Sequence, residues 1–163
     1  MTMDVQEAIK RSIQTEKNAM NFYQYGAMLM QDPEACRVFE VLAAEEREHA
    51  GQFFKYYTGC DIPSLDAFLD TPPDNTSVWM YSISNVVAED FSEKMALELA
   101  MEREKNLEEA LLETAAKIDE VQVRTVFELN ARETRNHYLM IEAEYARIMG
   151  MVHESDMDTF VRE

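Results

Sequence analysis

A glutamate and a histidine share the buried face of a predicted helix at about residues 33–58. Five residues recur at helical spacing and form one stripe, namely Phe39, Leu42, Glu46, His49 and Phe53. A carboxylate on such an apolar stripe is costly to bury unless it has a partner. Glu-x-x-His on one face therefore indicates a metal site, although so short a pattern also occurs by chance in exposed helices.

The pattern recurs later in the chain, with a constant offset of 88 positions. The matching pairs are Glu16 with Glu104, residues 38–40 with residues 126–128, and His49 with His137. Such periodicity indicates two copies of one structural unit, here a pair of helices. Each unit offers one Glu from its first helix, and a Glu and a His from its second.

The composition is typical of a helical protein. Of the 163 residues, 47% are hydrophobic, and Gly and Pro number only four each. A chain of this length forms one domain with a single core, and few Gly and Pro disfavour a sheet protein with many turns. The formal charge of −17 argues against binding to nucleic acid or to anionic membranes.

Four long helices are predicted, at about residues 4–30, 33–58, 92–117 and 119–150. Short connections join the first to the second and the third to the fourth, so each pair is an antiparallel hairpin. Residues 59–91 form a long crossover with short helical pieces. The predicted fold class is thus an all-α four-helix bundle over residues 1–152, in which Gly150 ends the last helix and 153–163 is a tail.

The two other glutamates of the repeat also lie on apolar stripes. The stripe residues are Ile9, Ile13, Met20 and Tyr23 around Glu16; Leu97, Met101, Leu107 and Leu111 around Glu104; and Val126, Leu129, Glu133, His137, Met140, Ile141 and Ile148 on the fourth helix. A lone Glu on a stripe is more often an edge residue than a ligand, but the match between the two units favours ligands. Tyr23, two turns from Glu16, is a candidate to act beside the metal.

Buried carboxylates that point at one another repel unless cations neutralise them. Oxygen ligands combined with imidazole suit iron or manganese, and also zinc. One Glu from each of two helices, with Glu-x-x-His from each of the other two, is the arrangement of ferritin-like di-iron proteins.

The chain resembles the rubrerythrin family of the ferritin-like superfamily over roughly residues 4–150. The motifs that carry the resemblance are residues 16–23, 42–49 and 96–104, together with His137. The resemblance implies that Glu16, Glu46, His49 and Glu104 are metal ligands, that His137 is the second histidine, and that the cofactor is two iron ions.

Two features depart from the family pattern. The Glu expected three residues before His137 is replaced by Thr134. Glu133 lies on the same helical face and could replace it with altered geometry, so we expect the ion nearer Glu46 and His49 to bind more tightly than the ion nearer His137. The sequence also has no Cys-x-x-Cys pair, so it lacks the rubredoxin-like iron site of full-length members, and the resemblance then implies a separate electron-donor protein.

Three functions remain open at this level. The first is a di-iron oxidoreductase that reduces peroxide or dioxygen. The second is a bundle that binds iron or zinc without turnover. The third is a metal-free interaction module, in which the buried Glu and His residues must find hydrogen-bond partners.

The remaining expectations concern assembly and location. Trp79 and Tyr81 in the crossover either pack on the bundle or form an apolar patch, and such a patch together with the resemblance predicts a homodimer. The sequence shows no secretory signal and no apolar run of membrane-spanning length. With only Cys36 and Cys60, a reduced, cytoplasmic protein is expected.

We expect Glu16→Ala and Glu104→Ala each to lose metal while the helical fold persists, because each removes a charge that only the ions make tolerable inside the bundle. Without metal, both variants should be at least as stable as the wild type, since repulsion falls. Elemental analysis and circular dichroism check this. Unchanged metal content in both variants would show that these residues are not ligands.

Overall fold

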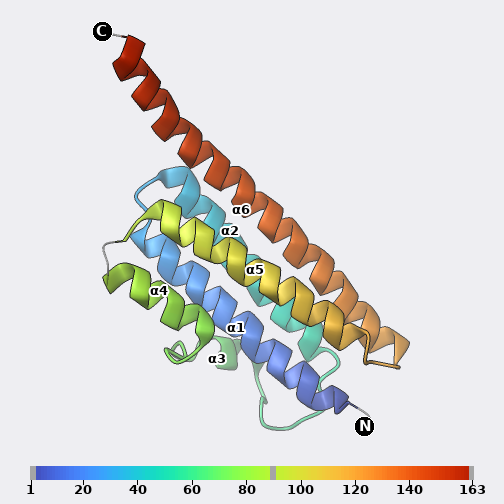
Figure 1. Ribbon diagram of the computed structural model, residues 1–163. Coiled ribbons are helices and arrows are strands. Elements are labelled where there is room, and N and C mark those ends of the chain that lie inside the picture. Colours follow the sequence, from blue (N-terminus) through green and yellow to red (C-terminus); the bar gives the residue numbers. More distant parts are fainter. Residues whose placement is uncertain (1–2, 89–90, 162–163) are drawn as a thin grey trace.

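The computed structural model describes residues 3–88 and 91–161, and within them the side chains of residues 3–85 and 91–150. Four long helices form the bundle, namely α1 (Val5–Leu29), α2 (Pro33–Phe54), α5 (Glu93–Ala115) and α6 (Val121–Val161) (Figure 1). The described residues contain no strand. The all-α fold class predicted from the sequence is therefore confirmed.

The helices pair as two antiparallel hairpins, because α1 packs mainly on α2 and α5 on α6. Figure 1 shows α2 and α5 running in the same direction, so the chain between them crosses the length of the bundle. Two short helices lie in this crossover, α3 (Leu65–Leu69) and α4 (Val78–Ala88). The long crossover predicted between the second and third long helices is thus present.

Local chemistry sets most helix starts. The carboxylates of Asp4 and Asp32 and the hydroxyl of Ser92 accept hydrogen bonds from the first backbone N–H groups of α1, α2 and α5. Pro33 occupies the first position of α2, where its missing N–H costs nothing.

Two predicted helix ends differ from the structure. α2 ends at Phe54, before the predicted end near Thr58. The backbone N–H groups of Tyr56 and Tyr57 donate to the carbonyls three residues earlier, in a tighter turn that does not continue the α-helix. α6 does not end at Gly150 but continues to Val161. A helical Gly costs only about 1 kcal/mol relative to Ala, so it need not end a helix. The segment predicted to be a tail, residues 153–163, is therefore helical as far as Val161, and its side chains lie outside the described ones.

The two hairpins are structurally equivalent, and their outer grooves show this most directly. One groove lies between α1 and α2 and the other between α5 and α6, with volumes of about 470 and 480 Å³. The first is lined by Met20, Gln24, Ala27, Met28, Glu40, Ala43, Ala44 and Arg47, and the second by Glu108, Leu112, Ala115, Ala116, Glu128, Ala131, Arg132 and Arg135. Each residue of the second set lies 88 positions after one of the first. The internal repeat is therefore a repeat of structure.

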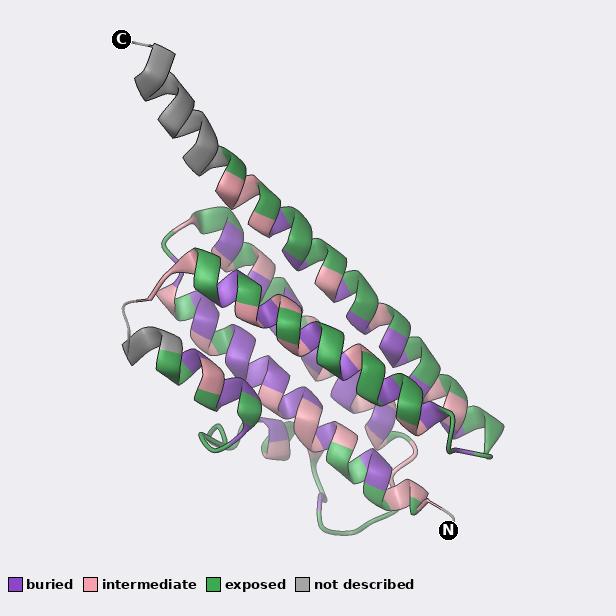
Figure 2. Ribbon diagram, in the orientation of Figure 1, coloured by how far each residue is buried: buried purple, intermediate pink, exposed green. Residues whose placement is uncertain are grey.

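The buried stripe of α6 is rotated by one residue from the predicted stripe. Leu129 and Met140, predicted to be buried, are 45% and 37% exposed, whereas Phe127 and Ala131 are buried. Apolar residues occur on both sides of the stripe, so helical periodicity alone fits either choice. Figure 2 shows the buried positions of all four long helices facing one another inside the bundle.

The crossover is fastened to the first hairpin. Trp79, Met80 and Ile83 are buried, whereas Tyr81 is 62% exposed. Trp79 therefore packs on the bundle and does not contribute to an exposed apolar patch. The buried ammonium of Lys17 donates to the backbone carbonyl of Pro72 at 3.1 Å, which holds the crossover against α1.

No helix in the described part of the chain is both long and apolar enough to cross a bilayer. Cys36 and Cys60 are free cysteines.

Gly26→Ala should destabilise the protein by about 1–3 kcal/mol, because overpacking a core is costly. A Cβ atom at this position would lie 2.6 Å from two ring carbons of Phe39. Gly51→Ala is the matched control, since its Cβ would meet only Leu65, at 3.9 Å. The control should be neutral or stabilising by up to about 1 kcal/mol. Urea unfolding of both variants measures the difference, and equal stability would show that α1 and α2 can move apart.

Candidate metal centre

The four long helices bring five polar side chains to one place inside the bundle. The residues are Glu16 from α1, Glu46 and His49 from α2, Glu104 from α5 and His137 from α6. All five are almost completely buried. The structure therefore groups five of the six ligands predicted from the sequence.

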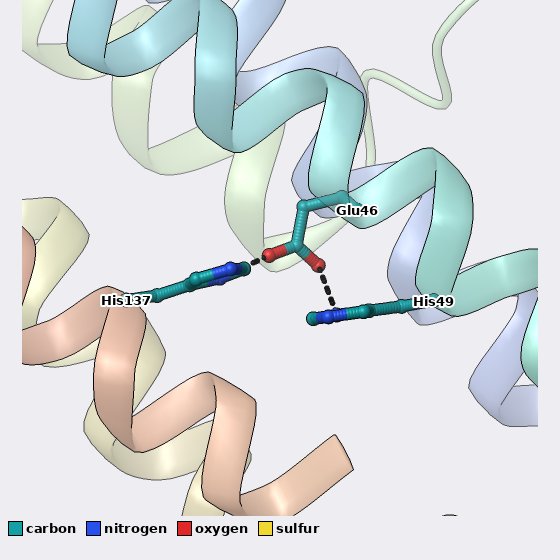
Figure 3. A group of neighbouring side chains, drawn as sticks. All are labelled: Glu46, His49 and His137. Atoms are coloured by element: carbon teal, nitrogen blue, oxygen red, sulfur yellow. Dashed lines mark ion pairs between the residues drawn. The ribbon is translucent and has the colours of Figure 1, made fainter.

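Glu46 lies between the two histidines and presents one oxygen to each (Figure 3). Its Oε1 is 2.7 Å from Nδ1 of His137, and its Oε2 is 3.7 Å from Nδ1 of His49. The imidazole rings are nearly parallel, with centroids 5.1 Å apart. One ligand atom from each of these three residues lies within 4.8 Å of the others, a separation that one bound ion can span.

Each of the remaining two carboxylates lies close to a different histidine. Oε2 of Glu16 is 3.7 Å from Nδ1 of His49, and Oε1 of Glu104 is 3.7 Å from Nδ1 of His137. Each imidazole is thus faced by its own Glu and by Glu46. This gives two similar three-residue sets that share Glu46.

The inner polar atoms do not satisfy one another by hydrogen bonds. Among the described residues, both carboxylate oxygens of Glu16 and of Glu46 and the Nδ1 atoms of His49 and His137 have no hydrogen-bond partner. Buried polar atoms without partners are destabilising. Atoms that converge at short distance without hydrogen-bond alignment fit a site that takes cations, and this donor set suits iron, manganese or zinc.

The electrostatics of the metal-free site point the same way. Burial and the facing charge of Glu46 raise the pKa of Glu16 well above its usual range, and burial raises the pKa of Glu104 to about 7. Burial opposes protonation of the histidines, but the facing carboxylates outweigh it, raising the pKa of His49 to about 12 and that of His137 to about 10. Without metal, protons on these groups therefore balance the buried charge.

A second carboxylate contacts the outer nitrogen of each histidine. Nε2 of His137 is 2.6 Å from Oε2 of Glu45, and Nε2 of His49 contacts Oε2 of Glu133. In a histidine that binds metal through Nδ1, Nε2 carries the proton and donates a hydrogen bond to such a carboxylate. This hydrogen bond orients the ring. Each histidine is therefore held by a glutamate from the opposite hairpin.

The structure does not bring Glu133 to the inner face, where the sequence analysis placed it. Glu133 lies 88 positions after Glu45, and the two residues make equivalent contacts with the opposite histidine. The true counterpart of Glu46 is Thr134, whose buried hydroxyl donates to the carbonyl of Asn130 at 2.7 Å. Sequence reasoning missed Glu45, although applying the repeat offset backwards from Glu133 leads to it.

Tyr23 lies beside the centre, as the sequence analysis anticipated. Its hydroxyl donates to Oε1 of Glu104 at 2.5 Å. Burial, followed by the charge of Glu104, raises the pKa of Tyr23 well above its usual range. The phenol therefore stays protonated and restrains Glu104.

An opening of about 210 Å³ leads from the surface between α2 and α6 to the histidines. Its lining consists of Glu45, Glu48, His49, Glu133, Asn136, His137 and Met140. Carboxylates at this mouth attract cations and repel anions. The opening therefore reaches the two histidines at the edge of the centre, and its charge favours neutral or cationic small molecules.

Metal binding should release protons, because metal ligands must be deprotonated and His49, His137 and Glu104 hold protons near neutral pH. Affinity should therefore rise with pH, by about tenfold per pH unit for each proton displaced. Calorimetric titration with Zn²⁺ in buffers of different ionisation enthalpy counts the protons. Affinity that does not change between mildly acidic and mildly alkaline pH would contradict this assignment.

No curated protein and no solved structure matches the chain. A family model described as Rubrerythrin matches residues 7–145, which include all five inner residues and both outer glutamates. The chain belongs to the rubrerythrin family.

Proposed function

We propose that the protein is a di-iron carboxylate oxidoreductase that reduces hydrogen peroxide or dioxygen with electrons from a separate donor protein. The observation that carries the proposal is the convergence of three buried carboxylates and two buried imidazoles, most of whose inner atoms lack hydrogen-bond partners among the described residues. Membership of the rubrerythrin family supports iron as the metal and two as the number of ions.

Iron bound in this site supplies electrons and Lewis acidity, which weaken the O–O bond of an oxidant. The protein's own residues position the ions. Glu46 faces both histidines and would hold metal together with each of them, while Glu16 and Glu104 would each complete one set. Outer carboxylates fix the imidazole rings, so that little reorganisation is needed during the reaction.

The surroundings suit a small neutral oxidant. The mouth between α2 and α6 carries Glu45, Glu48 and Glu133. This negative charge disfavours anionic substrates but leaves hydrogen peroxide and dioxygen free to enter. Protons for the product water can enter by the same route, since Glu45 and Glu133 are partly exposed and contact the histidines.

A second function is favoured by one observation. Where the repeat would place another carboxylate, Thr134 has its hydroxyl bound to a backbone carbonyl. Three carboxylates cannot neutralise the four positive charges of two divalent ions, so the second ion is held less tightly. A bundle that binds one iron or zinc ion without turnover is therefore the alternative. A metal-free interaction module is not favoured, because the buried inner groups lack hydrogen-bond partners.

The test is to load the protein anaerobically with ferrous ion, count the metal, and add hydrogen peroxide. Rapid oxidation of two ferrous ions per chain, followed by re-reduction and further turnover with a soluble reductant, is expected. Binding of one ion, with peroxide oxidation no faster than that of free ferrous ion, would instead favour the metal-binding alternative.

Homodimer formation stays a proposal that follows from the family resemblance alone, since Trp79 is buried. Sedimentation at micromolar concentration decides it, and a monomer throughout would exclude it.

Titration of metal-free wild-type protein with Zn²⁺ should show two steps, the second weaker. Thr134→Glu should strengthen the second step, because it supplies the missing carboxylate next to both ions. Glu133→Gln serves as the control. Loss of an outer partner typically costs about 10–100-fold in affinity without changing stoichiometry. If Glu133→Gln removes one ion altogether, Glu133 is an inner ligand after all.

A further inference from the structure

Two aromatic side chains connect the metal centre with the surface at α4. Tyr23 donates its hydroxyl hydrogen to Glu104 at 2.5 Å. Its ring packs against Trp79, with centroids 5.9 Å apart and planes at 60°. Trp79 is 6% exposed and is flanked on α4 by the exposed residues Val78 and Tyr81. An unbroken contact path therefore runs from an inner carboxylate to the outer side of the bundle.

These residue types are suited to carry single electrons. Tyrosine and tryptophan give up one electron more easily than the other aromatic side chains, and neither loses a heavy atom when it does so. Oxidation of a phenol requires loss of its proton, and the carboxylate of Glu104 is in place to accept that proton. The hydrogen bond thus supplies the proton transfer that electron transfer through Tyr23 needs.

The surroundings protect such a path. Phe22 and Phe39 pack edge-on against the Tyr23 ring, with centroid distances of 5.1 and 5.0 Å. Phe22 also contacts Trp79, at 5.2 Å. These rings are harder to oxidise than Tyr23 and Trp79 and exclude water from both. A radical on either residue is therefore shielded from side reactions.

Among the described residues, the path is present in one half of the bundle and absent from the other. The position 88 residues after Tyr23 is Leu111, which is also buried. The crossover that carries Trp79 has no counterpart in the second hairpin. A leucine fills the equivalent position in the second hairpin. Packing of the bundle therefore does not by itself explain why this position carries a tyrosine in the first hairpin.

We propose that Tyr23 and Trp79 form a one-electron relay between the surface of α4 and the metal centre. This rests on the proposed oxidoreductase function and names the place where electrons enter. Reduction of hydrogen peroxide to two water molecules takes two electrons and two protons. The donor supplies the electrons one at a time, and the protons come from solvent.

Each electron transfer through Tyr23 is accompanied by transfer of its phenol proton. Tyr23 gives an electron to the centre and its proton to Glu104. Trp79 then gives an electron to the tyrosyl radical, which recovers its proton from Glu104. The donor restores Trp79, so that the donor is oxidised, peroxide is reduced, and both side chains end unchanged.

The first test needs no metal and uses the fact that the chain has a single tryptophan. Trp79 is photo-oxidised in metal-free protein by excitation at the red edge of its absorption, where tyrosine does not absorb, with a soluble electron acceptor in mildly alkaline buffer. Transient absorption should show the tryptophanyl radical converting into a tyrosyl radical. This reports electron exchange between the two rings, in the direction opposite to that of turnover. Tyr23→Phe should abolish the tyrosyl signal, and Tyr25→Phe, a half-buried neighbour on α1, should leave it intact.

Two outcomes of this test overturn the relay. One is a tryptophanyl radical that decays in the wild type without forming a tyrosyl radical. The other is a tyrosyl signal that persists in Tyr23→Phe, which would place the radical on another tyrosine. Circular dichroism of each variant confirms that the bundle is intact.

The second test separates the relay from the proposed function. Protein loaded with one ferrous ion per chain, which supplies only one of the two electrons that peroxide needs, is treated with hydrogen peroxide without a donor. Protein radicals are followed by electron paramagnetic resonance at equal metal content. A tyrosyl or tryptophanyl signal is expected in the wild type, with loss of the tryptophanyl signal in both Tyr23→Phe and Trp79→Phe. Iron oxidation by peroxide without any protein radical refutes the relay and leaves the proposed function standing. Radical transfer in metal-free protein, with no peroxide reactivity of the loaded protein, supports the electron path and refutes the function.

Discussion

Burial of like charges at the centre of the bundle is the constraint on which the rest of the structure depends. Glu16, Glu46 and Glu104 lie within a few ångströms of two imidazoles. Apart from Oε1 of Glu104, which accepts from Tyr23, their carboxylate oxygens lack hydrogen bonds among the described residues. Such a group is unfavourable unless protons or metal ions neutralise it. The raised pKa values of both histidines mean that protons neutralise the carboxylates when no metal is bound. A bound metal ion would neutralise them instead. Both kinds of neutralisation require four helices to hold the groups together.

Duplication explains how a short chain builds this centre. Each hairpin supplies an inner Glu, a His and an outer Glu that holds the histidine of the other hairpin. The exchange of outer contacts ties the two halves together across the centre. It also means that the polar group at the centre depends on residues from both hairpins, so neither half forms it alone.

Three residues make the two halves of the bundle different in ways that affect the centre. Thr134 occupies the position that corresponds to Glu46 in the repeat, which lowers the negative charge at the centre. Tyr23 replaces what is Leu111 in the other half and binds Glu104. The crossover adds Trp79 on the same side. The first hairpin therefore supplies one more inner carboxylate than the second. The aromatic residues that connect the centre with the surface also lie on its side of the bundle.

Sequence alone determined the helical fold and most of the polar residues that meet at the centre. The helical period placed Glu46 and His49 on a buried stripe, and the offset of 88 residues extended this to Glu104 and His137. Local features such as the caps at Asp4 and Asp32 also follow from the sequence, since they depend on neighbouring residues only.

Tertiary structure decided which face of α6 points inward, and with it the role of Glu133. Apolar residues lie on both sides of that stripe, so period alone cannot choose between Thr134 and Glu133. The contact of Glu45 with His137 and that of Trp79 with Tyr23 also arise only in the folded chain. These contacts join residues far apart in sequence, and the packing of whole helices, not the spacing within one helix, sets their distances.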